Sequence, residues 1–537
     1  MVTQGPGRIR LGVWLDGVEL PAWLHAALAA VRDVEGVTFG HVFQDAAPPP
    51  RRALAELLFA LYERLDRRAF ASAPDALAPM DARPLLVGVE TVRAQRSEAA
   101  QVLARAGLDV LLHLGSGRLP GAALGVPRLG VWSWSQLETA RRGGAPLLTA
   151  VERAEPVCET ALWILRPEPE PHRILARCLS SSDPNGRDRC EPVSLQRARA
   201  EAYWKSAAFP ARVLGRMLAA GAGLPDGLPA ADPVPDEDRA GALRTARLAA
   251  LVLLRMIGRR WRYRRLDARW YLALRPRRPA VPGSSMDGFV RLPMPPDRFF
   301  ADPFLVRHGD RDLLFYEDAD RRSEIGRIAC TELDAEGRPG RTAPVLEEEH
   351  HLSYPCVFAW QGEWWMIPES AAARRVALYR ATPFPWRWTL ERILFEGVRA
   401  ADPTVHARDG RLWLFMNLAP EGASANDELF LFHASDPRGP WKPHPKNPVV
   451  SDVRCARPAG RLFEHEGQLY RPAQDCSETY GGALVLRRVE LLDERGYHES
   501  TAARIGPEWQ PGAIATHSLA LSEAFEVVDV RILEPRA

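Results

Sequence analysis

The chain has 537 residues, more than a single hydrophobic core usually supports, so we expect two to four domains. It carries 70 Lys and Arg residues against 68 Asp and Glu residues, and the net charge of +2 gives no overall field that would favour nucleic acid as a partner. Apolar residues make up 46% of the chain, which is ordinary for a soluble globular protein.

The composition and the first residues predict a cytoplasmic protein. The seven cysteines are scattered and form no CxxC pair, which favours buried thiols in a reducing compartment over disulfides or a zinc site. The opening run MVTQGPGRIRLGVWLDG leads into a strand and has no apolar signal core. Abundant Arg, Ala and Pro indicate a bacterial source. We therefore expect a cytoplasmic location, and a peripheral location at the inner membrane stays open.

Residues 1–220 alternate between short apolar runs and amphipathic segments. This alternation predicts a doubly wound α/β domain with a parallel sheet. The expected helices cover residues 21–34, 52–68 and 95–107. The expected strands cover residues 8–15, 37–43, 84–90, 108–117 and 127–134.

The run DVLLHLGSGRLPGAALGVPRLGVWSW (109–134) resembles the core of the formyltransferase fold that binds folate cofactors. The resemblance implies an Asn–His pair, but Ser133 and Ser135 stand at those positions. Neither serine can transfer a proton near pH 7 as a histidine does. His113 is the nearest imidazole, and Asp183 lies in a turn-like setting. We therefore expect a formyltransferase-like domain with a degenerate site.

Residues 221–280 are expected to connect the two halves of the chain. The stretch 221–239 is rich in Pro, Gly and Asp and is typical of a linker. The stretch 244–270 is expected to be a helix with an apolar first half and an Arg-rich second half. Two interpretations stay open: a connector helix with solvated arginines, or a basic amphipathic segment that contacts anionic membrane lipid or a phosphorylated substrate.

Residues 281–537 contain an internal repeat that predicts an all-β five-bladed propeller. Each copy has a polar residue, a Pro, two small or apolar residues, a turn with Gly and an apolar strand. A weaker fifth copy begins at Thr516-His517-Ser518. The first residues of the four clear copies are Asp302, Tyr354, Asp402 and Arg457.

The first residue of each copy should start the innermost strand of a blade, so these polar groups should converge at one mouth of the central channel. Facing carboxylates can perform general acid–base chemistry on a glycosidic bond. Glu369 and Glu317 follow the second strands of their blades and add carboxylates at the rim. We predict that Asp302, Asp402 and Glu369 are catalytic and that Glu317 and Tyr354 bind substrate. The alternative is that the aspartates cap turns.

The motifs FADPFL, YPCVF, MIPES, ADPTV and ARPAG resemble the five-bladed propellers of arabinanases, β-xylosidases and fructan hydrolases. The longer pattern, through YRPAQDCSETYGG and THSL, resembles more closely the N-terminal propeller module of plant glucosamine inositolphosphorylceramide transferases. In the hydrolases a Glu acid starts the fourth blade, where this chain has Arg457. The resemblance also implies four further substrate-binding residues: Gln474, Asp475, Tyr480 and His517.

Arg457 in place of the Glu weakens ordinary hydrolysis and favours a carboxylate or phosphate ligand, since the guanidinium pairs with both. The expected partners are a sugar nucleotide, a glycan or a phospholipid-linked sugar, without a cofactor or a metal. Three hypotheses stay open: a transferase or processing enzyme of surface-glycan or glycolipid synthesis, a non-catalytic glycan-binding module, or an N-formyltransferase acting on an amino sugar.

Overall fold

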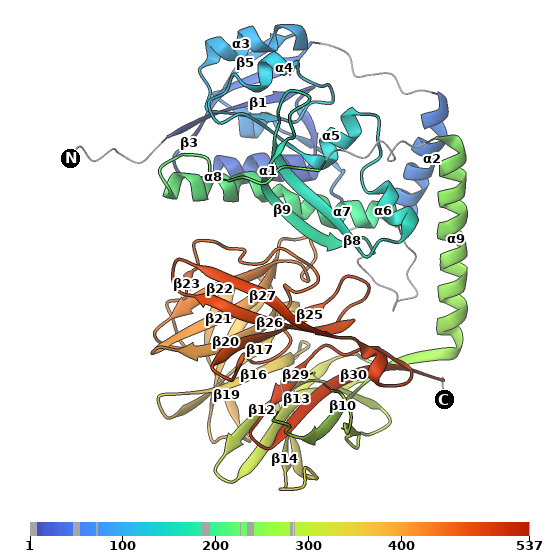
Figure 1. Ribbon diagram of the computed structural model, residues 1–537, viewed down its shortest axis with the longest axis vertical. Coiled ribbons are helices and arrows are strands. Elements are labelled where there is room, and N and C mark those ends of the chain that lie inside the picture. Colours follow the sequence, from blue (N-terminus) through green and yellow to red (C-terminus); the bar gives the residue numbers. More distant parts are fainter. Residues whose placement is uncertain are drawn as a thin grey trace, which may run out of the picture. The chain divides into compact units, whose positions relative to one another are not determined.

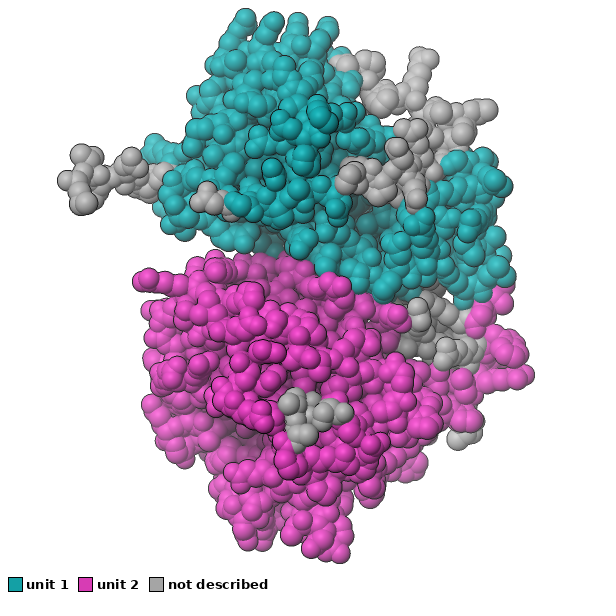
Figure 2. All heavy atoms as spheres, in the orientation of Figure 1, with its two compact units in different colours: residues 1–184, 192–255, 421–423 teal, residues 185–191, 256–420, 424–537 magenta. Residues whose placement is uncertain are grey.

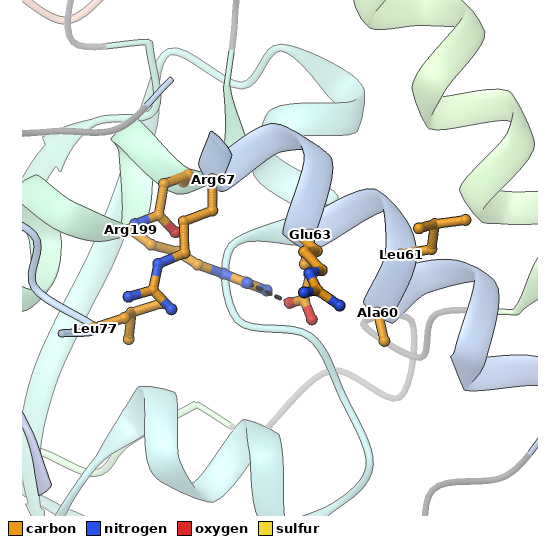
Figure 3. A pocket seen from close by; sticks show the side chains of 8 residues that line it. Ala60, Leu61, Glu63, Arg67, Leu77 and Arg199 are labelled. Carbon is orange, nitrogen blue, oxygen red and sulfur yellow. Dashed lines mark hydrogen bonds and ion pairs between the residues drawn. The ribbon is translucent and has the colours of Figure 1, made fainter. Parts of the chain in front are cut away.

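A computed structural model describes residues 8–46, 54–70, 74–183, 194–225, 227–232, 241–279, 283 and 285–535. The chain forms two compact units (Figure 2). Unit 1 comprises residues 1–184, 192–255 and 421–423, and unit 2 comprises residues 185–191, 256–420 and 424–537. Cys190 and residues 226 and 233–239 of the expected linker lie outside the described residues.

Unit 1 is built on a seven-stranded mixed sheet with the order β5-β3-β1-β6-β7-β8-β9 (Figure 1). The first five strands in that order are parallel, as predicted, whereas β8 and β9 are antiparallel. The strands are β1 (Ile9–Leu15), β3 (Val37–Asp45), β5 (Glu90–Ala94), β6 (Val110–His113), β7 (Val131–Trp134), β8 (Val157–Ile164) and β9 (Arg173–Ser181). The strand expected at 84–90 is a 3-10 turn at Arg83–Leu86, and β5 follows it.

Helices cover both faces of this sheet, because its strands are apolar on both sides. One face packs against α1 (Ala22–Arg32), α7 (Leu195–Ala207) and α8 (Phe209–Ala219), and Trp23 stacks there on Tyr203 at 5.0 Å between ring centroids. The other face packs against α3 (Ala99–Ala106) and α4 (Gly121–Leu124). The remaining helices of the unit are α2 (Leu54–Ala69), α5 (Ser135–Arg141) and α6 (Leu148–Arg153).

The formyltransferase-like identity of unit 1 finds no support. Ser133 is fully buried, donates a hydrogen bond to the carbonyl of His113 and accepts one from Arg141. Burial and the nearby Arg141 hold the pKa of His113 well below its ordinary value. The hydroxyl of Ser135 accepts a hydrogen bond from the backbone of Ala161. These side chains belong to the packing of the sheet rather than to a proton-transfer site.

Unit 2 is a five-bladed β-propeller. Four blades are regular four-stranded antiparallel sheets, formed by β12–β15, β16–β19, β20–β23 and β24–β27. Their first strands are β12 (Arg298–His308), β16 (Ser353–Trp360), β20 (Arg399–Arg408) and β24 (Phe463–His465). The second, third and fourth strands of these blades are β13 (Arg311–Asp320), β14 (Gly326–Leu333), β15 (Pro339–Leu346), β17 (Glu363–Glu369), β18 (Arg375–Ala381), β19 (Trp388–Glu396), β21 (Arg411–Ala419), β22 (Leu429–Ala434), β23 (Lys442–Pro443), β25 (Gln468–Asp475), β26 (Ala483–Leu492) and β27 (Tyr497–Ile505).

The fifth blade joins strands from the two ends of the unit. The short strands β28 (Ala513–Ala515) and β29 (Leu519–Leu521) pair with β30 (Phe525–Pro535), and β30 pairs with β10 (Leu266–Pro276) along its whole length. Beyond β10 lies β11 (Val290–Arg291). The helix expected at 244–270 is α9 (Ala242–Arg265), so its last residues belong to a strand and the propeller sheet begins ahead of the expected boundary at 281.

Candidate functional site

Three blades start their innermost strands with the same unusual backbone conformation. Asp302, Tyr354 and Asp402 have φ values of 53°, 46° and 50°, and each precedes a proline at a point where the strand register shifts. A non-glycine residue in this left-handed region costs about 1–3 kcal/mol and persists only where its surroundings enforce it. Such bulges re-aim side chains, and here they do so at equivalent positions of the ring.

Arg457 starts the fourth copy and forms a buried ion pair with Asp402. Its Nε lies 2.6 Å from Oδ2 and its Nη2 lies 3.1 Å from Oδ1 of that carboxylate. Nη2 also lies 3.4 Å from Glu369, and Nη1 donates to the side chain of Asn426 at 2.9 Å. Burial by itself would lower the pKa of Arg457, but Asp402 and Glu369 raise it well above its ordinary value. The guanidinium is therefore a fixed cation whose nitrogens already have partners.

Two further residues complete the surroundings of Asp402. Glu369 lies at the end of β17, and its Oε2 accepts the backbone N–H of Asp402 at 2.9 Å. Gln474 donates to Oδ2 of Asp402 at 2.8 Å and to the carbonyl of Pro458 at 2.7 Å. The structure thus brings together four residues that the sequence singled out, from the second, third and fourth blades.

Asp302 lies in a second polar group that joins the first and fifth blades. Its Oδ1 accepts a hydrogen bond from Ser518 at 3.0 Å and lies 3.1 Å from Nε2 of His517. Burial opposes ionisation, but the positive charge of His517 and these hydrogen bonds lower the pKa of Asp302. The other ring nitrogen of His517 lies 2.8 Å from Asp529. One carboxylate oxygen each of Asp302 and Asp529 and one ring nitrogen of His517 lie within 4.8 Å of one another, so these three residues could hold a metal ion.

Aromatic side chains border both groups. The guanidinium carbon of Arg457 lies 4.8 Å from the ring centroid of Tyr480, whose ring is 5.2 Å from that of His517. The ring of Trp270, on β10, lies 4.2 Å from that of His517. Tyr480 is 36% exposed, so this aromatic edge is the solvent-accessible part of an otherwise buried cluster. Flat apolar rings beside carboxylates suit the two faces of a sugar ring.

Glu317, Tyr354 and Asp475 stand apart from these direct contacts. Glu317 is buried, with His351 at 3.4 Å, and burial together with the charge of Asp302 raises its pKa well above the ordinary value. The hydroxyl of Tyr354 is held between Thr404 and the backbone N–H of Gly460, at 2.9 and 2.6 Å. Asp475 caps its own turn through Ser477 and pairs with Arg504. Binding roles for these three residues stay predictions.

Sequence reasoning missed Asp529, Ser518, Asn426 and Trp270. Asp529 was detectable in principle, since an acidic residue interrupts the apolar run of β30, and such a residue seldom lies in a core without partners. Trp270 was missed because its segment was assigned to a helix. Asn426 lies in a loop with no pattern to mark it.

Comparison with known proteins gives a match that is confined to the propeller. Residues 290–509 match the family model described as "Glucosamine inositolphosphorylceramide transferase 1, N-terminal". The curated protein "Glucosamine inositolphosphorylceramide transferase 1" of Oryza sativa subsp. japonica is 39% identical over 208 residues, which are 38% of this chain and 28% of that protein. Its namesake in Arabidopsis thaliana is 38% identical over 210 residues, 38% of this chain and 27% of that protein. The match thus spans less than a third of these relatives.

Solved structures with a likeness to the chain include carbohydrate-active enzymes. The family 117 glycoside hydrolase Zg3597 of Zobellia galactanivorans is 12% identical, with a TM-score of 0.33 over 49% of this chain and 90% of that one. The GH32 β-fructofuranosidase of Bombyx mori is 15% identical, with a TM-score of 0.31 over 40% of this chain and 52% of that one.

The expected cytoplasmic location is contradicted by these relatives, which are plant proteins named glucosamine inositolphosphorylceramide transferase 1. The bacterial source inferred from composition likewise finds no support, since the curated relatives are from plants. The propeller and its resemblance to the transferase module are confirmed. The propeller of this chain is therefore similar to the N-terminal module of these transferases.

Proposed function

We propose that the propeller holds a glycosyl group at the cluster of Asp302, Asp402, Glu369 and Arg457, and that the protein transfers or processes sugars in glycan or glycolipid synthesis. The observation that carries the proposal is that Asp302, Asp402 and Arg457, which start the repeat in three different blades, lie near one another, with Glu369 at the end of β17 beside them. The names of the matching relatives, transferases of a glycosylated ceramide, support the substrate class.

Asp302 and the neighbouring carboxyl group of Glu317 differ in their proton affinity, which suits acid–base chemistry. His517 lowers the pKa of Asp302, whereas burial raises the pKa of Glu317 on the neighbouring strand. Two carboxyl groups whose environments separate their pKa values can act as base and acid at one pH. We assign Asp302 as the carboxylate that accepts a proton or contacts a sugar hydroxyl, and Glu317 as the carboxylic acid that donates one.

The pairing of Arg457 changes the expected ligand contact. Its Nε, Nη1 and Nη2 already bond Asp402, Asn426 and the Tyr480 hydroxyl. A phosphate or carboxylate would have to displace one of them. We therefore place the sugar ring, rather than an anionic group, against the carboxylates. A sugar nucleotide or a phospholipid-linked sugar remains the proposed source of that ring.

The test measures binding and turnover separately, because a non-catalytic glycan-binding module is the competing function. The full chain is titrated with neutral glycans, UDP-sugars and lipid-linked sugars, and turnover is followed by mass spectrometry. Asp302→Asn should lower kcat by about 100-fold or more and leave Kd within a few fold for an enzyme. Loss of binding alone would assign a lectin-like pocket. Asp312→Asn, at a buried aspartate paired with Arg307, is the control.

A second proposal concerns lipid contact through residues 244–270. Leu254, Ile257 and Trp261 are exposed on one side of α9, and the helix carries eight arginines and no acidic residue. Exposed apolar side chains beside arginines favour the surface of an anionic bilayer. None of the described helices is long and apolar enough to cross a membrane. Co-sedimentation with phosphatidylserine vesicles tests this contact. We expect Ile257→Glu to lose the co-sedimentation that the wild type shows, and we expect the two proteins not to differ with neutral vesicles.

A further inference from the structure

Asp529 ties the last blade of the propeller to the first. Its carboxylate is fully buried on β30, and Oδ1 accepts the backbone N–H groups of His517 at 3.0 Å and Ser518 at 2.8 Å. Oδ2 accepts the backbone N–H of Asp302 at 3.0 Å, across 227 residues of chain. One carboxylate therefore fixes the backbone at the start of the first blade and at the irregular segment of the fifth.

The same carboxylate lies beside the imidazole ring of His517. Nδ1 lies 2.8 Å from Asp529 and Nε2 lies 3.1 Å from Asp302, and the side chain is 2% exposed. An imidazole that faces a carboxylate at both nitrogens donates from both only when it is protonated. Burial by itself would lower the pKa of His517, but the two carboxylates raise it to about 10.

The other groups around the ring of His517 are aromatic rings and one buried carboxyl group. Trp270 and Tyr480 cover the ring with aromatic surface, and the charge of His517 in turn acts on the nearby buried carboxyl group of Glu317. On Asp302, Oδ1 takes both Ser518 and His517, whereas no donor among the described residues bonds Oδ2. That oxygen is left for a ligand.

We propose that Asp529 is a positioning residue, which keeps His517 charged and oriented and thereby holds Asp302 as an ionised carboxylate with one oxygen free. The inference deepens the proposed function, because it says how the first-blade carboxylate is prepared. The inference concerns the charge state of His517, which can be measured without an activity assay. A carboxylate behind a histidine commonly fixes the orientation of the ring in this way.

The competing account is a bound cation, since Asp302, His517 and Asp529 offer three ligand atoms. The two ring nitrogens point to opposite sides of the imidazole, so a single ion can contact only one of them. The other nitrogen would still donate to its carboxylate. A cation therefore requires a neutral ring, whereas the proposal requires a charged one.

The decisive measurement is the titration of His517 by NMR in the metal-free full chain with 13C-labelled histidine, assigned with His517→Gln. The wild-type ring should keep its imidazolium shift until the pH approaches about 10. In Asp529→Asn, which keeps the shape and removes the charge, the midpoint should fall by about 1–3 pH units. Asp312→Asn should leave the midpoint unchanged.

Several outcomes would overturn the proposal. A titration midpoint of His517 near pH 6.5 in the wild type would overturn the proposal by itself. This outcome can be measured even if Asp529→Asn fails to fold. A stoichiometric divalent ion whose removal by EDTA shifts the His517 signal would assign a metal site instead. An unchanged midpoint in folded Asp529→Asn would refute the role of Asp529. If His517 behaves as expected but no glycan binds, the inference stands and the proposed function fails.

Discussion

Arg457 and Asp402 form a two-point ion pair inside the propeller, with Nε 2.6 Å from Oδ2 and Nη2 3.1 Å from Oδ1. The side chains are 10% and 2% exposed, so the pair is desolvated. A buried charge that loses its partner is costly, whereas a buried pair as a whole is often close to neutral. Removing one partner of the pair should therefore lower the free energy of unfolding, whether or not a ligand is present.

Replacing Arg457 with Met should lower the free energy of unfolding by about 3–5 kcal/mol, because Asp402 would remain buried without its cation. Urea unfolding followed by circular dichroism measures this loss. Adding Asp402→Asn to the same chain should recover part of it. Arg504→Gln is the matched control, since Arg504 pairs with Asp475 at 3.0 Å but is 54% exposed, and it should cost about 1 kcal/mol or less. Equal effects of the two arginine variants would contradict a buried pair.

A fragment that starts at residue 281 should not fold, although one that starts at 256 should. The shorter fragment lacks β10, which pairs with all of β30. Without β10 the apolar strand β30 would become a free edge, and free apolar edges aggregate. Size-exclusion chromatography and the melting curves of both fragments decide this. A monomeric, cooperatively melting 281–537 fragment would show that β10 is dispensable.

Gly460→Ala should destabilise the propeller far more than Gly512→Ala. Both glycines have positive φ, 126° and 79°, but a Cβ at Gly460 would lie 2.1 Å from the carbonyl oxygen of Leu519, whereas nothing lies within 4 Å at Gly512. The clash would push apart the fourth and fifth blades. We expect a loss of about 1–3 kcal/mol or more beyond that of the control variant, measured by thermal and urea unfolding. Equal losses would show that backbone strain alone matters.

The stability that His517 contributes should depend on pH in a defined direction. Its pKa is raised from 6.5 to about 10 in the folded chain, so the contribution is complete below pH 6.5 and is lost as the pH rises towards 10. The difference in Tm between the wild type and His517→Gln should therefore shrink over that range. A constant difference for His517→Gln would contradict a charged ring.

The sequence by itself determined the blades of the propeller. Each of the four regular blades is formed by one contiguous stretch of sequence, so the repeated polar residue, Pro and Gly could be aligned without knowledge of contacts. The same repeat placed Asp302, Tyr354 and Asp402 at equivalent positions, and the structure gives all three the same left-handed backbone. The alternation in unit 1 likewise indicated its parallel strands, because amphipathic periodicity is a local property.

Only the tertiary structure decided which charges meet. The pairing of Arg457 with Asp402 joins residues 55 apart, and that of Asp529 with Asp302 joins residues 227 apart. Local pattern carries no signal for such contacts, since it is ring closure that brings the first and last strands together. Residues 266–270 of the closing strand β10 were mistaken for the end of a helix for the same reason, because the strand identity of β10 comes from the hydrogen bonds that β30 supplies.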